Sequence, residues 1–356
     1  MIPAFLTALV AVFLAFLSRN EKKHSYFLLL AFVVLTAFLS LGYYWGNDVA
    51  KYEERFEYYS NSGIALFDFS QYGFIALKEL GFVFINLLCK PIGFWGMRAV
   101  LFIIENAILY YFIVRHVDRR WYWLAVFIYV FNPNFWVLSS SMMRQWLAIC
   151  IVVLSVDFLL RKKNVAFVLL VLLASTVHIT ALICLAFLPL SMLQRKTTTK
   201  TIPFFLLLLF LYYVFSPIFI DSLASFLVEE DFYVGYTSQK GSVGITGIGR
   251  MVIYILLLYS ALKWGAKEKL LYWIVLLYGF ILPLLSFGEL SSRLGFYFLI
   301  FTIATYPSFL SIPNIKSLPK TMVVGLVCVY LLYLFNWFFH SPTYYSSYWN
   351  YVPMTF

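Results

Sequence analysis

The chain has 356 residues, of which 63% are hydrophobic and only 12% are charged, and its mean hydropathy is +0.87. A water-soluble domain carries about a quarter charged residues, so this composition excludes a soluble enzyme of this length. The formal net charge is +10, but the basic residues lie in small groups between apolar runs, which argues against nucleic acid as a partner. The sequence predicts one integral membrane domain that covers residues 1–356.

Apolar stretches of membrane-spanning length recur along the chain. An α-helix needs about 20 apolar residues to cross a bilayer, and about twelve such helices are expected. They lie at residues 2–17, 27–45, 98–115, 121–138, 143–160, 164–177, 179–193, 202–219, 250–263, 270–286, 293–310 and 321–339. Residues 2–17 lack the basic n-region of a cleavable signal peptide. The pattern predicts an all-α, polytopic membrane protein.

One apolar segment, residues 71–95, does not fit a simple crossing. A full crossing there would invert the orientation of the basic residues at 115–120. We therefore expect a re-entrant or surface-lying helix pair, broken near Pro91, Gly93 and Gly96. Irregular backbone at membrane depth needs protein or water around it, so this segment is expected to border a cavity.

The basic residues indicate the orientation of the chain. Of the 26 lysines and arginines, 17 fall in six short loops on one side, at residues 18–25, 115–120, 161–163, 195–200, 263–269 and 311–320. Cytoplasmic loops are rich in Lys and Arg, so this side is expected to be cytoplasmic. Both termini and most carboxylates then lie outside, with outer loops near 46–97 and 221–249 and an outer tail at 340–356.

Three arginines lie where helices are expected to begin on the outer side: Arg144, Arg250 and Arg293. A guanidinium beside the free N–H groups of a helix N-terminus is a strong anion binder. Three of them indicate an anionic ligand, most simply a phosphate or a diphosphate. For each arginine alone, the alternative is an interfacial side chain that reaches the lipid headgroups.

Three residues on the outer side are candidates for acid–base chemistry: His178, Asp48 and Glu289, in that order of preference. A neutral imidazole is basic near physiological pH, and an aspartate on a loop can reach a sugar hydroxyl. The alternatives are a hydrogen-bonded structural histidine and solvated loop carboxylates.

Two carboxylates lie inside apolar helices. Glu105 is a functional candidate by default, although Asn106 and nearby tyrosines could hydrogen-bond it, whereas Asp157 lies near Arg161, which favours a structural ion pair. The four cysteines show no metal-ligand spacing, and the sequence contains no Asp-x-Asp pair or cluster of ligands. No metal and no cofactor are therefore expected.

Three short motifs follow one another along the chain: Arg144-Gln145-Trp146-Leu147-Ala148, the basic turn at residues 161–163, and His178-Ile179-Thr180-Ala181-Leu182. They resemble the EpsG/Wzy-like family of bacterial O-antigen, capsule and exopolysaccharide polymerases. That family shows an Arg-Gln-x-x-Ala helix, a short basic turn, and a histidine followed by Ser/Thr-Ala-Leu. Further matches are Asp48-x-x-x-Tyr52, Phe232-Tyr233-x-x-Tyr236 and Arg293-x-x-x-Tyr297-Phe298, whereas Trp146 stands where a small residue is usual.

The resemblance implies a metal-independent glycosyltransferase in the bacterial cytoplasmic membrane, with an active site that faces the periplasm or exterior. We expect a GT-C-like arrangement of helices. Its reaction would join repeat units carried on undecaprenyl diphosphate by inverting transfer. Arg144, Arg293 and Arg250 would bind the diphosphate, and His178, Asp48 or Glu289 would accept the proton. The implied partners are the undecaprenyl-diphosphate-linked donor and acceptor oligosaccharides, the lipid bilayer, a chain-length regulator and a flippase.

Two alternative functions stay open at this point. A flippase or transporter of lipid-linked glycans also needs arginines for the diphosphate, and a GT-C glycosyltransferase adds one sugar from a lipid-phosphate donor. A transporter should present polar residues through its full depth, whereas here they stop in the outer half, apart from Asp157. The internal repeats common in transporters were not found in the sequence. Both observations favour an enzyme.

Overall fold

The computed structural model describes residues 1–20, 25–62, 80–193, 197–212, 214–215, 245–266, 268–280 and 289–354. Within these ranges the regular elements are helices, and the one β-bridge joins Gly42 to Pro353. The chain divides into two compact units: unit 1 is Met1–Leu185 with Lys316–Phe356, and unit 2 is Ala186–Ile315. The prediction of an all-α protein is confirmed for the described residues.

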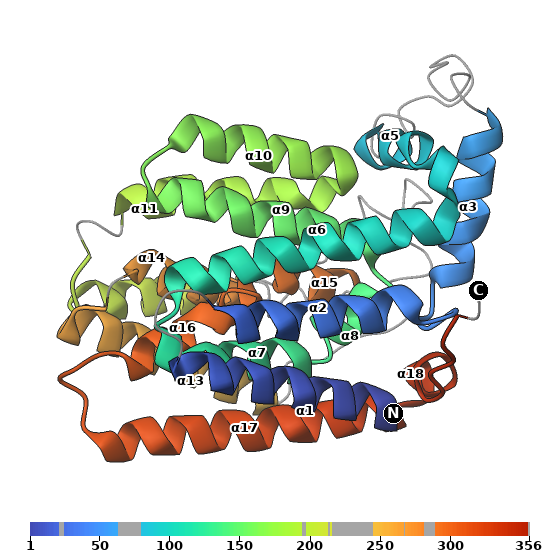
Figure 1. Cartoon of the computed structure of the whole chain (residues 1–356). Coiled ribbons are helices and arrows are strands. Elements are labelled where there is room, and N and C mark those ends of the chain that lie inside the picture. Colours follow the sequence, from blue (N-terminus) through green and yellow to red (C-terminus); the bar gives the residue numbers. More distant parts are fainter. Residues whose placement is uncertain are drawn as a thin grey trace. The chain divides into compact units, whose positions relative to one another are not determined.

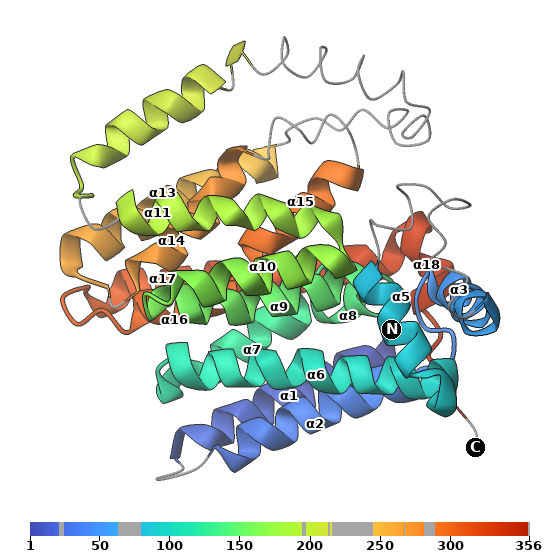
Figure 2. The same cartoon turned by 90° about the horizontal axis from the view of Figure 1, so that it is seen from above.

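Unit 1 is a stack of long helices. α1 packs on α2 and α7, α2 packs on α6, α6 on α9, and α9 on α10, as both views show (Figures 1 and 2). Its helices are α1 (Ile2–Leu17), α2 (Tyr26–Leu41), α3 (Val49–Ser62), α5 (Leu80–Leu88), α6 (Gly93–His116), α7 (Tyr122–Phe131), α8 (Trp136–Ser139), α9 (Met143–Leu160), α10 (Asn164–Val177), α17 (Ser317–His340) and α18 (Pro342–Tyr348).

The face that α1 turns toward its neighbours consists of small side chains. Its alanines recur at helical spacing and are at most 1% exposed: Ala4, Ala8, Ala11 and Ala15. Lipid tails are as apolar as leucine, so helices associate in a bilayer through close packing, which small residues permit. Large apolar residues such as Leu6 and Phe13 are exposed on the same helix. This division is the one expected of a helix with one protein face and one lipid face.

Unit 2 contains the remaining described helices: α11 (Phe187–Leu193), Thr201–Tyr212, α13 (Ile245–Trp264), α14 (Lys269–Leu277), α15 (Glu289–Leu299) and α16 (Thr302–Leu310). α13 packs on α14 and α16, and α14 also contacts α11 and α15. The outer loop predicted near 221–249 and the motif Phe232–Tyr236 fall on residues outside the described part, except for 245–249.

Five described helical segments are long and apolar enough to cross a membrane: Ile2–Asn20, Lys90–His116, Met143–Leu160, Arg293–Leu310 and Ser317–His340. Shorter apolar helices are Tyr26–Leu41, Asn164–Val177, Ile179–Leu193, Thr201–Tyr212 and Met251–Trp264. These segments support a multi-pass membrane protein. Twelve crossings and a GT-C-like arrangement stay predictions, as does a single domain over the whole chain.

Several predicted helices are interrupted in the structure. The helix expected at 121–138 divides into α7 and α8 around Pro133, because proline removes a backbone donor and disfavours helical geometry in the residue before it. The helix expected at 179–193 begins as the 3-10 helix Ile179–Ala186 and continues as α11. The helix expected at 293–310 breaks between α15 and α16.

The segment predicted as re-entrant is described from residue 80 onward, and residues 71–79 lie outside the described part. α5 has nine residues, about 13 Å of helix at 1.5 Å per residue, which is too short to cross a bilayer. It packs against α3 and α10. A break follows, where Gly93 has φ of 72°, a conformation that favours glycine. Gly96, expected in the break, lies inside α6 instead.

Candidate functional site

The connection between α2 and α3, residues 42–48, carries Asp48 and is the centre of the candidate site. It passes close to the start of α9 at Gly46, whose φ is 132°. A Cβ atom at this position would lie 2.9 Å from Ser141 Oγ and 3.0 Å from Ser140 Oγ. Glycine is therefore required here both for the backbone conformation and for the close approach of the loop to the serines.

The C-terminal tail, residues 341–354, holds this loop from the other side. The Tyr43 N–H donates to the Val352 carbonyl at 2.9 Å, and the Trp45 indole N–H donates to the Tyr348 carbonyl at 3.1 Å. The Met354 N–H donates to the carbonyl of the last residue of α2 at 2.7 Å. These bonds join segments about 300 residues apart in the chain, so the tail is part of the site rather than a loose end.

Arg98 supports the loop from within α6, where its side chain is fully buried. The guanidinium donates to the Gly42 carbonyl from Nη1 at 2.5 Å and to the Trp45 carbonyl from Nη2 at 3.4 Å. Its planar group spans two acceptors at once, which fixes the start of the loop relative to α6. The prediction missed Arg98 because it placed the helix start at residue 98, where an arginine looks interfacial. The sequence feature that could have indicated its role is a charged residue inside an apolar run.

Ser141 joins the loop, the tail and α9. Its Oγ accepts the Asn47 N–H at 2.6 Å and is hydrogen-bonded to the Tyr348 hydroxyl. Burial raises the pKa of that tyrosine, so its hydroxyl keeps its proton at physiological pH. Ser141 therefore fixes the residue next to Asp48 against the segment that leads into α9.

Arg144 is the second residue of α9. Its guanidinium carbon lies 5.8 Å from the ring centroid of Tyr52 and 5.8 Å from that of Phe82, within the range of cation–π attraction. Tyr52 lies one turn after Asp48 in α3, and its N–H donates to the Asp48 carbonyl at 3.0 Å. Arg144 and Asp48 are thus at the same end of unit 1, hereafter the Asp48 end.

His178 is the residue that caps the C-terminal end of α10, and its backbone is extended. Its N–H closes the last helical turn on the Ala174 carbonyl at 2.9 Å, and its Nδ1 is hydrogen-bonded to the Thr180 hydroxyl at 2.5 Å. Fixing one ring nitrogen orients the imidazole. The side chain is partly buried.

α5 borders both Arg144 and the turn that holds His178. Phe82 of α5 lies beside the Arg144 guanidinium, and a Cβ at the preceding Gly81 would lie 2.2 Å from Thr176 Oγ1 in the last turn of α10. The glycine lets α5 seat directly on α10. The structure therefore brings Asp48, Arg144 and the end of α10 to one end of unit 1.

The other three predicted site residues, Arg250, Glu289 and Arg293, lie in unit 2. The prediction that both arginines open their helices is wrong. Because the residues before them are already helical, Arg250 is the sixth residue of α13 and Arg293 the fifth of α15. Arg293 is partly buried, and the side chains of Arg250 and Glu289 lie outside the described part. A pairing of Arg144 with Arg293 stays a prediction.

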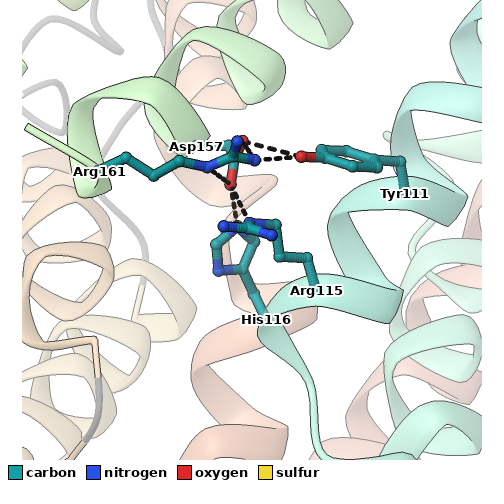
Figure 3. Close-up of polar contacts among 5 residues, drawn as sticks. All are labelled: Tyr111, Arg115, His116, Asp157 and Arg161. Atoms are coloured by element: carbon teal, nitrogen blue, oxygen red, sulfur yellow. Dashed lines mark hydrogen bonds and ion pairs between the residues drawn. The ribbon is translucent and has the colours of Figure 1, made fainter. Parts of the chain in front are cut away.

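A second polar cluster surrounds Asp157, about 20 Å along α9 from Arg144 at 1.5 Å per residue. Its carboxylate is fully buried and accepts from Arg115 Nε at 2.7 Å and from the Tyr111 hydroxyl at 3.1 Å. His116 Nε2 lies 3.0 Å from the same carboxylate, and Arg161 forms an ion pair with it (Figure 3). The expected pair with Arg161 is confirmed, and the three partners from α6 were missed because α6 and α9 are distant in sequence.

Glu105 is 1% exposed, and among the described residues neither of its carboxylate oxygens has a hydrogen-bond partner. The neighbours that were expected to hydrogen-bond Glu105 have other partners. The Tyr129 hydroxyl donates to the Asn106 side-chain oxygen at 3.0 Å, and the Asn106 amide donates to the Phe102 carbonyl at 3.0 Å. Among the described residues, no three His, Cys, Asp or Glu side chains form a group that could hold a metal ion.

Comparison with known proteins shows the family of the chain. A family model described as the EpsG family matches residues 6–352 of the chain. Neither a curated protein nor a solved structure matches it. The match covers nearly the whole chain, including both units.

Proposed function

The chain belongs to the EpsG family, and from that premise we propose that it is a polysaccharide polymerase of the bacterial cytoplasmic membrane. It joins oligosaccharide repeat units carried on undecaprenyl diphosphate by inverting glycosyl transfer. The observation that carries the proposal is the family match from residue 6 to residue 352. The geometry of the Asp48 end supports the roles given to individual residues.

Arg144 supplies the first part of the site. It lies in the first turn of α9, and the N-terminal end of a helix favours an anion. In the reaction, an acceptor hydroxyl attacks the anomeric carbon of the donor, the bond from that carbon to the diphosphate oxygen breaks, and the electron pair leaves with the lipid diphosphate. A fixed cation at the leaving group stabilises the charge that develops there. In the proposal, Arg293 and Arg250 of unit 2 also bind the diphosphate.

The proton of the acceptor hydroxyl goes to a base at the Asp48 end. His178 is the proposed base because a neutral imidazole is basic at working pH and its Nδ1 is fixed by Thr180. Asp48 is the alternative, on a loop at the same end of unit 1 as Arg144, with Lys51 Nζ 3.2 Å from its carboxylate. Glu289 is the third choice. The reaction as written needs no metal, since arginines carry the electrostatic role.

The orientation follows from the basic loops. In unit 1 the 3-10 helix at Ser18–Asn20 packs against the one at Arg119–Trp121, and Asp157 joins Arg115 to Arg161. Three of the six basic loops therefore meet at one end. By the excess of basic residues in cytoplasmic loops, we propose that this end is cytoplasmic and that the Asp48 end faces the exterior.

A gene deletion distinguishes the proposal from its two alternatives through the intermediate that accumulates. Loss of a polymerase leaves complete, single repeat units on undecaprenyl diphosphate, exposed on the outer face. Loss of a flippase leaves the same unit on the cytoplasmic face, and loss of a single-sugar transferase leaves a unit that lacks one sugar. Mass spectrometry of the extracted lipid, with labelling of intact cells for exposed glycan, separates the three. Either of the last two results contradicts a polymerase.

A further inference from the structure

Three aromatic side chains at the Asp48 end form a compact cluster that the proposed reaction does not use. Tyr43 and Tyr44 come from the loop at residues 42–48, and Trp95 comes from the first turn of α6. Their ring centroids are 4.6 Å apart for the two tyrosines, 5.3 Å for Tyr43 and Trp95, and 5.4 Å for Tyr44 and Trp95. Tyr43 is 46% exposed and Tyr44 is 40% exposed. We call these three residues the aromatic corner.

The aromatic corner is held in place from several sides. Tyr44 has φ of 44°, a left-handed conformation that is unfavourable for a residue with a large side chain. Its hydroxyl is hydrogen-bonded to the Glu53 carboxylate in α3. Trp95 lies 5.4 Å from the guanidinium carbon of the buried Arg98. A strained backbone at an exposed tyrosine is typical of a functional position.

The charged groups near Tyr44 are acidic, whereas the buried Arg98 lies near Trp95. The hydrogen bond to Glu53 raises the pKa of Tyr44 to about 12, and the negative charges of Glu53 and Glu57 contribute. Tyr44 therefore keeps its proton at physiological pH. Carboxylates at the rim disfavour an anionic lipid headgroup or a diphosphate as the occupant, because like charges repel. They are suitable acceptors for hydroxyl groups.

Aromatic faces beside hydrogen-bond acceptors match the surface of a sugar ring, which has apolar C–H faces and hydroxyls at its edge. Ligand sites commonly combine aromatic walls with a few placed polar groups, and Tyr and Trp suit positions that are apolar on one side and wet on the other. We propose that Tyr43, Tyr44 and Trp95, with Glu53, form a glycan-binding subsite that holds a sugar ring of the repeat unit or growing chain. Its role in polymerisation rests on the proposed function.

The position of the aromatic corner suits this role. Tyr43 and Tyr44 belong to the same short loop as Asp48, so a sugar held there lies close to the candidate site without occupying it. The Tyr43 N–H also donates to Val352 of the tail at 2.9 Å, and the loop is fixed to α6 through Arg98. The subsite is therefore preorganised, which reduces the entropy lost on binding.

Binding is tested with the full-length protein in lipid nanodiscs and a defined probe. The probe is a set of oligosaccharides of one to three repeat units, released by mild acid from the polysaccharide of the source cell. Tyr44→Asn removes the ring but suits the left-handed backbone, and Trp95→Ala removes the second wall. We expect each to weaken binding about tenfold, while Tyr44→Phe, which keeps the ring, retains most of it. The controls are Tyr333→Ala and Trp337→Ala, which are exposed aromatics of α17.

The outcomes separate the subsite from a membrane-anchoring role and from the proposed function. Equal binding by wild type, Tyr44→Asn and Trp95→Ala overturns the subsite, as does a wild-type protein that binds no oligosaccharide. A similar loss in the α17 controls also overturns it, since it would mark a general aromatic belt. Ring-dependent binding by a protein that makes no polymer would support the subsite while refuting the polymerase. In a polymerising protein we expect Tyr44→Asn to raise the acceptor KM about tenfold and leave kcat nearly unchanged.

Discussion

At the scale of single residues, the loop that carries Asp48 is held by a buried charge. Arg98 is fully buried and bonds to two backbone carbonyls. Removing a charged group from water is costly, and the two hydrogen bonds to the backbone offset part of that cost. They also fix the start of the loop that carries Asp48 to α6.

We expect Arg98→Lys to loosen this loop. An ammonium group cannot reproduce the planar fork that reaches both Gly42 and Trp45, and each buried carbonyl left without a donor costs about 1–3 kcal/mol. Hydrogen exchange in residues 43–48 should rise, and turnover should fall. Arg120→Lys is the control, because Arg120 is exposed and its guanidinium donates to the nearby Asp118 carboxylate rather than to the loop. Unchanged exchange in Arg98→Lys would refute the positioning role.

The assignment of the base rests on two residues that make different demands. If His178 is the base, His178→Gln abolishes transfer while the protein still binds the lipid-linked donor. Asp48→Asn then mainly raises the acceptor concentration that transfer requires. If Asp48 is the base, the two variants show the opposite results. Donor binding and turnover are measured on the same purified protein. Full turnover by His178→Gln would leave His178 only its hydrogen-bonded role at the end of α10.

At the scale of elements, the Asp157 cluster connects α6 to α9 through one buried carboxylate. Asp157→Asn would leave Arg115 and Arg161 close together without the anion between them. Breaking a buried ion pair costs about 3–5 kcal/mol, and we expect about 2 kcal/mol here because both arginines are partly exposed. The thermal unfolding midpoint should fall, with activity per folded molecule unchanged.

Two further variants test that interpretation of the Asp157 cluster. In Asp157→Asn/Arg115→Gln the repulsion between the two arginines is removed, so part of the lost stability should return.

Asp118→Asn is the control for the Asp157 variants. The hydrogen bond from Arg120 lowers the pKa of Asp118, so its contribution is present at neutral pH and is lost as the pH falls through that lowered pKa. The pair is exposed, and its removal should change stability little. A large loss of activity in folded Asp157→Asn would contradict a structural role.

The sequence predicted continuous helices better than interrupted ones. α1, α9 and α10 have the predicted bounds because charged or polar turns follow them. α7 and α8 were predicted as one helix, since hydropathy does not distinguish a broken apolar helix from a continuous one. The starts of α13 and α15 were placed at their arginines, although residues before a charge can be helical as well.

The candidate site was predictable in part. Arg144, Asp48 and His178 could be proposed because they are polar residues at the ends of apolar helices. The roles of Arg98 and of the tail could not, because the bonds from Arg98 to Gly42 and from Tyr43 to Val352 join segments 56 and about 300 residues apart. Such contacts depend on packing that no local pattern encodes.

At the scale of the whole molecule, the basic loops and the Asp48 end define the two faces of unit 1. The N-terminal amino group donates to the Trp349 carbonyl, so the start of the chain and the tail at residues 341–354 both lie at the Asp48 end, which agrees with the predicted placement of both on one side. Reporter fusions after Arg120 and after Glu230 should report opposite sides of the membrane, with the first inside. Agreement between the two fusions would contradict the predicted orientation.

The central claim is that this protein polymerises lipid-linked repeat units at a site that depends on Arg144. The most direct measurement is reconstitution of the purified protein in liposomes with undecaprenyl-diphosphate-linked repeat unit as the only substrate, followed by gel analysis of the glycan. We predict a ladder spaced by one repeat unit and inversion at the anomeric carbon. Arg144→Lys should slow its formation about 10²–10³-fold, while Arg55→Lys, at an exposed position in α3, should not. The absence of any product longer than the substrate, or an equal ladder from Arg144→Lys, would contradict the account.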